Sequence, residues 1–343
     1  REVVGARNNV GMVDVSTLGK IDIQGKDASE FLNRIYTNGW TKLPIGRARY
    51  GLMLREDGIV FDDGTTSRLS EQHYFMTTTT SNAASVLSHM EYYLQVHWPD
   101  LDVKIASVTE QWAAMAIAGP NSRKVLEKFL EVEDVSDEAL PFMGVKEFLI
   151  NGIPAIIFRI SFSGELAYEI NVAADHGEYV WNHIMEKGIT ENIIPYGTEA
   201  MGIMRIEKGH VAGGELDGRT TADDLGLNKL LSSKKEFIGR RLLDREGFVD
   251  PKRPKLVGIV PTDGKSRIRS GAILVEDPNA SLPMAKLGHV SSGAYLSPTL
   301  KHPIALGLIT GGTNKIGKTV WAVSPLHGLS LIHISEPTRL GFI

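Results

Sequence analysis

Two adjacent carboxylates, Asp62 and Asp63, are the residues of this chain best placed to do chemistry. They end an apolar run in the segment 49–69, RYGLMLREDGIVFDDGTTSRL, whose alternating pattern predicts two strands. Asp57-Gly58 supplies the positive φ that a hairpin turn between the strands requires. Because successive side chains of a strand point to opposite faces, one of the two carboxylates is expected to face inward. An inward carboxylate is a candidate catalytic group, and a solvated strand end is the alternative.

The elements around this hairpin predict an α+β body followed by a small β domain. Before residue 250, strands and helices mix without a regular βαβ rhythm, which argues against a doubly wound sheet. Asn151-Gly152 marks a second hairpin. The run Asp-Pro-Lys-Arg-Pro at 250–254 has the composition of a linker. Beyond it the pattern predicts strands alone, typical of a small barrel or sandwich, at 256–260, 272–275, 288–294, 304–309 and 319–323.

The composition narrows the possible chemistry. Hydrophobic residues make up 42% and charged residues 23% of the chain, as in an ordinary globular protein, and the net charge of -4 gives no field that favours nucleic acid. The absence of cysteine excludes thiolate catalysis and cysteine-ligated metals, and it allows a cytoplasmic location. No apolar run approaches the roughly 20 residues that span a bilayer. No GxGxxG, GxxxxGK[ST], HExxH or GxSxG motif is present, so an enzyme of this sequence would depend on carboxylates or a bound cofactor, with no metal expected.

Five motifs, in order along most of the chain, resemble the aminomethyltransferase family, the T-protein of the glycine cleavage system. The motifs are Val10-Gly11 through Asp14-Val15-Ser16 with Gly19, Asp57-Gly58 with Asp62-Asp63, Phe162-Ser163-Gly164-Glu165 with Tyr168-Glu169, Arg205-Ile206-Glu207, and Ser292-Gly293 through Leu296-Ser297-Pro298-Thr299-Leu300. The resemblance implies the α+β aminomethyltransferase fold, which binds folate and ends in a small β-barrel domain.

Several variants narrow the resemblance to the C-terminal half of the alpha subunit of heterotetrameric sarcosine oxidase. These variants are the segments 14–20, 49–54, 61–65, 77–80 and 108–113. The resemblance implies that this chain binds tetrahydrofolate. It places FAD, FMN and NAD in missing upstream parts or in partner subunits of a cytoplasmic hetero-oligomer. It implies no nucleic-acid or membrane partner.

The same resemblance assigns roles to two acidic residues. Asp63, the second carboxylate of the pair, is implied as the catalytic group that positions the pterin nitrogens, stabilises a cationic intermediate and moves a proton. Asp62 is then expected to face away, as strand alternation requires. Glu169 is implied to grip the pterin, because a carboxylate can accept two parallel hydrogen bonds from the ring N–H and the amino group.

Four further residues are implied as part of the pterin pocket. Tyr50 and Asn82 match pocket positions, and Phe162 stands where the T-protein has Tyr, so it can pack a ring but cannot donate a hydrogen bond. Arg205 lies two residues before Glu207 on one predicted helix, and the two side chains cannot share a face. At most one of these two is therefore expected in the pocket, with a structural ion pair as the alternative for the other.

The implied function is transfer of the one-carbon unit of oxidised sarcosine to tetrahydrofolate, which yields methylene-tetrahydrofolate and glycine. A non-catalytic folate-binding or assembly module and a freestanding aminomethyltransferase are the alternatives. The expected division is a folate-binding domain at 1–250, a β-barrel at 251–328 and a tail at 329–343. The tail, LSLIHISEPTRLGFI, resembles translated sequencing-adapter read-through and is expected to be foreign. It would replace the closing strand of the small domain and leave an unpaired edge.

Overall fold

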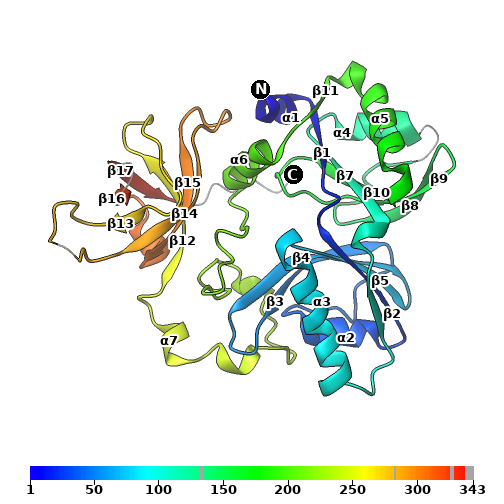
Figure 1. Cartoon of the computed structure of the whole chain (residues 1–343), viewed down its shortest axis with the longest axis horizontal. Helices are drawn as coiled ribbons and strands as arrows, with labels where there is room; N and C mark the ends of the chain where they lie inside the picture. The colour runs from blue at the N-terminus through cyan, green and yellow to red at the C-terminus, as the bar shows by residue number, and fades with distance from the viewer. Residues whose placement is uncertain (131–133, 282, 325–327, 337–343) are drawn as a thin grey trace.

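The computed structural model contains two β-sheets packed face to face and a separate β-barrel (Figure 1). It describes all residues except 131–133, 282, 325–327 and 337–343. The first sheet has the strand order β11-β1-β7-β10-β9-β8, and the second has the order β3-β4-β5-β2-β6. The barrel closes in the order β12-β15-β14-β13-β16-β17. This architecture confirms the predicted α+β fold with a C-terminal β-barrel.

The first sheet is covered on its outer face by two helices. Its strands are β1 (Val10–Asp14), β7 (Trp112–Ala118), β8 (Val145–Ile150), β9 (Ile153–Phe158), β10 (Ala167–Ala173) and β11 (Ile193–Pro195). The covering helices are α4 (Ser122–Leu130) and α5 (Gly177–Lys187). Val125 and Phe129 of α4 and Val180 and Ile184 of α5 are buried against alternate residues of the strands, such as Ile170. The helical spacing of these residues builds one apolar face on each helix.

The second sheet carries the predicted Asp62-Asp63 hairpin. Its strands are β2 (Gly19–Gln24), β3 (Arg47–Leu54), β4 (Val60–Ser70), β5 (His73–Thr78) and β6 (Lys104–Ser107). The helices α2 (Ala28–Ile35) and α3 (Ala83–Tyr92) cover its outer face, and a π-helical turn (Tyr93–His97) extends α3. The hairpin between β3 and β4 confirms the prediction, and Gly58 at its turn has φ 87°. The predicted second hairpin is also confirmed, because Asn151 and Gly152 have φ values of 50° and 82°.

Aromatic side chains join the inner faces of the two sheets. The rings of Phe75 on β5 and Phe158 on β9 stack with their centroids 5.7 Å apart. Trp112 of β7 meets Phe75 edge to face at the same centroid separation of 5.7 Å. Ala48 of β3 and Ile156 of β9 are buried in the same cluster. These residues of the two inner faces therefore pack against each other.

The barrel contains one strand more than the sequence analysis predicts. Its strands are β12 (Pro254–Pro261), β13 (Ile273–Val275), β14 (Gly288–Ala294), β15 (Ile304–Thr310), β16 (Thr319–Ser324) and β17 (Gly328–Ser335). The strand β17 pairs antiparallel with both β16 and β12, so the expected unpaired edge is absent from the described residues. Ile332 and Ile334 are buried in the barrel core, and their period-two spacing explains why this segment completes the sheet. Residues 337–343 of the predicted foreign tail lie outside the described residues.

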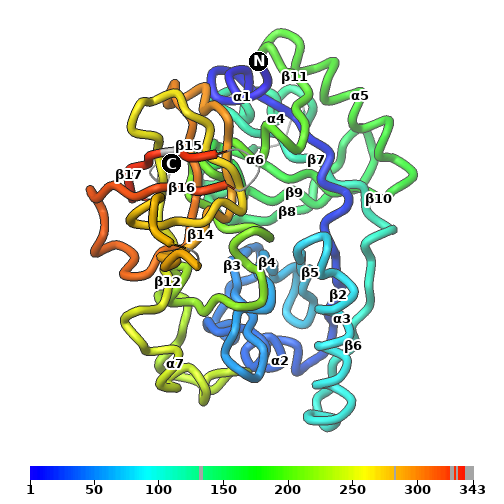
Figure 2. The backbone as a smooth tube through the Cα atoms, turned by 60° about the vertical axis from the view of Figure 1, so that its left-hand side comes forward, coloured from blue at the N-terminus to red at the C-terminus, as the bar shows by residue number. Residues whose placement is uncertain are grey.

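The helix α6 (Thr198–Lys208) lies between the first sheet and the barrel, where it contacts β14 and β15 (Figure 1, Figure 2). At the N-terminus, α1 (Glu2–Asn8) contacts the N-terminal strand β1 and α6. An apolar cluster that includes Leu52, Ile206 and Leu306 joins the second sheet, α6 and the barrel. The barrel therefore shares a buried core with the two-sheet body.

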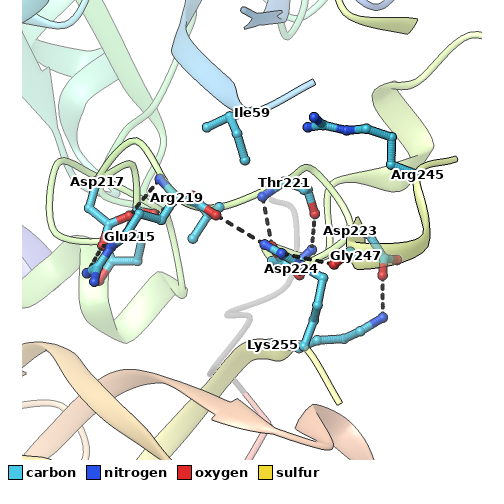
Figure 3. A network of polar contacts seen from close by, with 12 residues as sticks. Ile59, Glu215, Asp217, Arg219, Thr221, Asp223, Asp224, Arg245, Gly247 and Lys255 are labelled. Atoms are coloured by element: carbon cyan, nitrogen blue, oxygen red, sulfur yellow. Dashed lines mark hydrogen bonds and ion pairs between the residues drawn. The ribbon is translucent and has the colours of Figure 1, made fainter. Parts of the chain in front are cut away.

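The predicted linker is fixed to the body by a buried ion pair. Arg253, just before β12, donates from Nη2 to the Asp224 carboxylate at 2.5 Å and from Nε at 3.0 Å. The Asp224 side chain is 1% exposed and also accepts from the Thr221 backbone N–H. Asp223 and Lys255 pair beside it (Figure 3). The short helix α7 (Glu246–Val249) and the linker thus run from the body to the barrel without a free hinge at Arg253.

We predict that Arg253→Ala lowers the free energy of unfolding by about 3 kcal/mol, because it leaves the buried Asp224 carboxylate without its cation. Urea denaturation followed by circular dichroism measures the change. The matched control is Arg219→Ala, which removes an exposed ion pair with Asp217. The control is expected to change stability by less than about 1 kcal/mol. Equal effects of the two substitutions would contradict the structural role of Arg253.

Candidate functional site

The two carboxylates of β4 point to opposite faces of the second sheet, as strand alternation predicts. Asp62 is 1% exposed and lies on the helix-covered side. It accepts hydrogen bonds from the Thr79 backbone N–H and from Nδ2 of Asn82, both at 3.2 Å. Asp63 lies on the inner side, where the hydroxyl of Tyr50 donates to its Oδ2 at 2.6 Å. The two neighbouring carboxyl groups are therefore separated by the sheet, with Asp63 on its inner face and Asp62 on its helix-covered face.

Burial perturbs the ionisation of both carboxyl groups. Desolvation raises the pKa of Asp62 to about 7, against the hydrogen bonds from Thr79 and Asn82, and the neighbouring Asp63 charge adds to the rise. Desolvation also raises the pKa of Asp63, while the hydrogen bond from Tyr50 opposes the rise. A carboxyl group whose pKa is raised toward neutrality can hold or release a proton near physiological pH.

The ring of Tyr50, which donates to Asp63, belongs to a group of three rings. The imidazole of His210 lies edge to face with Tyr50 at 5.9 Å and with Phe162 at 4.9 Å between ring centroids. Tyr50 comes from β3, Phe162 from the loop between β9 and β10, and His210 from the segment after α6. Burial lowers the pKa of His210 to about 4, so its ring is neutral at physiological pH. The rings bring two predicted pocket residues, Tyr50 and Phe162, together around a histidine that the sequence analysis did not single out.

Glu169 lies on β10 with its side chain on the inner face of the first sheet. It pairs in register with Phe158, whose ring stacks on Phe75 of the second sheet. Desolvation raises the pKa of Glu169 to about 7, and the charge of Lys20 on β2 opposes the rise. Lys20 is 1% exposed, and its ammonium donates to the backbone oxygens of Ser16 at 2.8 Å and of Leu18 at 3.0 Å. A half-buried carboxyl group on one sheet and a buried cation on the other are therefore close enough for their charges to interact.

Asn171 shares this inner face of β10, two residues beyond Glu169. Its side chain is 1% exposed, and neither Nδ2 nor Oδ1 has a hydrogen-bond partner among the described residues. Buried amide groups without partners are rare in folded proteins, and they call for an explanation such as a ligand or a bound water. The carboxyl group of Glu169 and the amide of Asn171 together offer acceptors and donors along one strand. This set fits a flat heterocycle with neighbouring N–H and C=O groups, such as a pterin.

Two predicted pocket residues point elsewhere. Nδ2 of Asn82 donates to the Phe61 carbonyl at 3.0 Å and to Asp62, on the face of β4 opposite to Asp63. The guanidinium of Arg205 pairs with Glu215 at 2.8 Å and donates to Oγ of Ser292 in the barrel at 2.6 Å. Asn82 binds Asp62, which strand alternation places on the face of β4 opposite to Asp63. Arg205 binds the buried carboxylate of Glu215 at the boundary between the body and the barrel. Neither side chain is hydrogen-bonded to Asp63.

Glu207, the other charge of the Arg-Ile-Glu motif, lies in a separate ion pair. It accepts from Nη2 of Arg7 at 2.7 Å and from Oγ of Ser297 at 2.5 Å. Arg7 also pairs with Glu165 at 2.7 Å. Both charged residues of the motif, Arg205 and Glu207, therefore lie in ion pairs, which is the structural alternative that the sequence analysis left open. Neither ion pair follows from a local sequence pattern, because Arg7 lies near the other end of the chain and Glu215 lies in an irregular segment after α6.

Two further residues at the site, Lys20 and Asn171, were not predicted as functional. The lysine stands at an inward position of a strand between Gly19 and Ile21, and a charged residue at such a position is a signal that could have been used. His210 and Asn171 have no sequence signal, because their significance comes from neighbours on other elements. Among the described residues, no group of three or more His, Asp or Glu side chains could hold a metal ion. No helix within the described ranges has the length and apolar character to cross a membrane.

Comparison with known families agrees with this fold. The GCVT N-terminal domain family matches residues 1–235, and the glycine cleavage T-protein C-terminal barrel domain family matches residues 255–328. The chain therefore belongs to the glycine cleavage T-protein family. The crystal structure of glycine cleavage system aminomethyltransferase T from Bartonella henselae superposes with a TM-score of 0.84 at 22% identity, over 99% of this chain and 88% of that protein. That likeness shows the shared fold.

Within this family the chain is similar to sarcosine oxidase subunit alpha. It is 50% identical to that subunit from Rhizobium meliloti (strain 1021) over 343 residues. The matched region covers 99% of this chain and 34% of the relative. It is 32% identical over 318 residues to the aminomethyltransferase of Chloroherpeton thalassium, over 92% of this chain and 83% of that protein. The chain spans about a third of the alpha subunits, which is less than the half implied by the sequence resemblance.

We predict that Asp62 makes the protein less stable as pH rises from about 4 to about 7. The folded-state pKa of about 7 lies above the unfolded value of about 3.9, so the folded protein binds a proton that the unfolded chain has released. This contribution to the free energy of unfolding is complete below the unfolded pKa and is lost as pH rises through the folded pKa. Asp62→Asn should therefore reduce the stability difference between about pH 5 and about pH 8.

Urea denaturation at the two pH values measures this difference. Asp100→Asn is the control, because Asp100 is exposed on the surface. The control should keep the pH dependence of the original protein. A pH dependence of Asp62→Asn equal to that of the control would show that Asp62 does not titrate between these values.

Proposed function

We propose that this chain is the tetrahydrofolate-binding part of a sarcosine oxidase alpha subunit. In this role it transfers the one-carbon unit of oxidised sarcosine to tetrahydrofolate, giving methylene-tetrahydrofolate and glycine. The observation that carries the proposal is the inward carboxyl group of Asp63, which accepts a hydrogen bond from Tyr50, on the sheet that faces Glu169. The 50% identity to a sarcosine oxidase alpha subunit supports this reaction over that of a freestanding aminomethyltransferase.

The residues divide the work between binding and chemistry. Tetrahydrofolate supplies the nitrogen atoms that accept the one-carbon unit. Glu169, ionised with the help of Lys20, accepts two parallel hydrogen bonds from the amino group and ring N–H of the pterin. The amide of Asn171 offers an additional donor and acceptor on the same face of β10. The buried surroundings strengthen each of these bonds, because competing water is excluded.

Asp63 takes the chemical role. Its carboxylate stabilises positive charge that develops at the one-carbon unit, and burial, which raises its pKa above the ordinary value, makes it a better proton acceptor than an exposed aspartate. The Tyr50 hydroxyl fixes the orientation of the carboxyl group through the bond to Oδ2. In the proposed enzyme, FAD, FMN and NAD belong to other parts of the subunit or to the partner subunits. The amine is therefore oxidised outside this chain, in a cytoplasmic hetero-oligomer.

We predict that Asp63→Asn in the assembled oxidase slows methylene-tetrahydrofolate formation by about 100-fold or more, because it removes a charged group that can transfer a proton. Sarcosine consumption should continue at its original rate, with formaldehyde released in place of the folate product. Product analysis by chromatography during sarcosine turnover, with and without tetrahydrofolate, measures this partition.

Asp62→Asn is the matched control, because it makes the same change one residue away on the opposite face of β4. It should leave the partition between methylene-tetrahydrofolate and formaldehyde unchanged. If Asp63→Asn behaves like this control, Asp63 is not catalytic. A chain that still binds folate would then be a non-catalytic folate-binding module of the assembly.

A further inference from the structure

His210 is held in place by its own backbone. Gly209 adopts a left-handed conformation, with φ 72°, and ends α6. The His210 backbone N–H donates to the carbonyl of Arg205 at 2.9 Å. Nη1 of Arg205 donates back to the carbonyl of His210 at 3.2 Å. Both polar groups of the His210 backbone are therefore tied to the last turn of α6.

Arg205 is in turn fixed by the barrel. It pairs with Glu215, which is fully buried, and donates to Oγ of Ser292 on β14 at 2.6 Å. Ser291 and Ser292 both donate to Oε1 of Glu215, at 2.5 Å and 2.7 Å. Every bond in this set is short and buried or half-buried, so the set defines one position for the His210 backbone.

The His210 ring lies between the two aromatic residues predicted for the pocket. Its centroid is 4.9 Å from that of Phe162 at an interplanar angle of 72°, and 5.9 Å from that of Tyr50 at 63°. Both are edge-to-face geometries, which aromatic pairs favour. The Tyr50 hydroxyl reaches Asp63 at 2.6 Å from the other end of the tyrosine ring. A change in the His210 ring would therefore free the ring that orients Asp63.

We propose that His210 is a positioning residue for Asp63. Its ring holds the Tyr50 ring in the place from which the tyrosine hydroxyl donates to the Asp63 carboxyl group. The proposal rests on the role of Asp63 proposed above. It gives Arg205 and the barrel residue Ser292 an indirect part at the site, because they fix His210 and do not bind Asp63.

The charged and titratable groups around Asp63 and His210 determine how a substitution of His210 changes the pH dependence of the reaction. Asp63 accepts hydrogen bonds from Tyr50 on β3 and Thr79 after β5, and its charge also interacts with Asp62 on the opposite face of β4 and with Tyr36 after α2. The hydrogen bond from Tyr50 lowers the pKa of Asp63, so its loss raises that pKa further.

The groups around His210 are Arg205, Lys208 and Glu215. Burial, with the charges of Arg205 and Lys208 beside it, lowers the pKa of His210 to about 4, so the histidine stays neutral between about pH 6 and about pH 8. Asp62 and Glu169, with pKa values of about 7, titrate in the same range, so a shift caused by His210→Ala reports Asp63 only if it is absent from the Asp63→Asn background.

The test compares His210→Ala, His210→Phe, Tyr50→Phe and the double variant His210→Ala/Tyr50→Phe in the assembled oxidase. His210→Ala should slow methylene-tetrahydrofolate formation by about tenfold or more, because a displaced reacting group loses rate steeply. It should also move the acidic limb of the pH profile to higher pH. His210→Phe keeps a ring of similar shape and should retain the rate within about threefold. In the Tyr50→Phe background, His210→Ala should add less than about twofold, since it acts through Tyr50.

A second readout does not depend on turnover. Calorimetric titration with tetrahydrofolate in two buffers of different ionisation enthalpy gives the number of protons taken up on binding. The pH at which this uptake is half-maximal should rise in His210→Ala and stay unchanged in His210→Phe. His210→Leu replaces the alanine variant if the latter does not assemble, because it fills more of the space without an aromatic edge.

Any of three results would overturn the proposal. The first is an unchanged pH profile and proton uptake in assembled His210→Ala, and the second is an equal loss of rate in the alanine and phenylalanine variants. The third is an effect of His210→Ala on the rate that is undiminished in the Tyr50→Phe background. Asp63→Asn in the same assays separates this failure from failure of the proposed function. If Asp63→Asn leaves the folate product unchanged, the catalytic role is wrong, whereas the proton-uptake comparison still tests the contact between His210 and Tyr50.

Discussion

The packing of two sheets face to face through Phe75 and Phe158 is the constraint on which the site depends. Once these rings fix the inner faces, strand alternation decides which side chains meet. Asp63 points inward from one sheet and Glu169 from the other, while Asp62 points to the helix-covered face of its sheet. The same packing removes both inward acids from much of the solvent, and desolvation is the largest cause of the raised pKa of each.

Two buried polar networks join the barrel to this pair of sheets. Arg205 and Glu215 meet Ser292 of β14, while Arg7 and Glu207 meet Ser297 in the loop after it. Buried ion pairs contribute little net stability, because desolvation offsets the attraction between the charges. Their value here is geometric, since each pair fixes where α6 ends and how the barrel lies against it. Through His210, that geometry extends to the ring of Tyr50, which donates to Asp63.

The parts of the fold that depend on local pattern could be predicted from the sequence. Asn151-Gly152 and Asp57-Gly58 predicted the two hairpins, and strand alternation predicted that one carboxylate of the Asp62-Asp63 pair points inward, because these features follow from neighbouring residues. The choice of Asp63 as the inward one came from the family resemblance. The destinations of Arg205 and Asn82 could not be predicted, since their partners lie on other elements. The closing strand β17 was also missed, although Ile332 and Ile334 alternate as a strand requires. The segment was interpreted only by its resemblance to sequencing-adapter read-through, so its alternating apolar pattern was overlooked.

The central claim is that the Glu169 carboxylate grips a pterin between the two sheets. Calorimetric titration of the 343-residue chain with tetrahydrofolate, compared with its Glu169→Gln variant, tests it most directly. Loss of the charge should weaken binding by about tenfold or more, since a hydrogen bond to a charged group contributes roughly 1.5–3 kcal/mol. Glu147→Gln, at an exposed position on β8 of the same sheet, is the control and should bind like the original chain. Equal affinity of folded Glu169→Gln and the control would contradict the account.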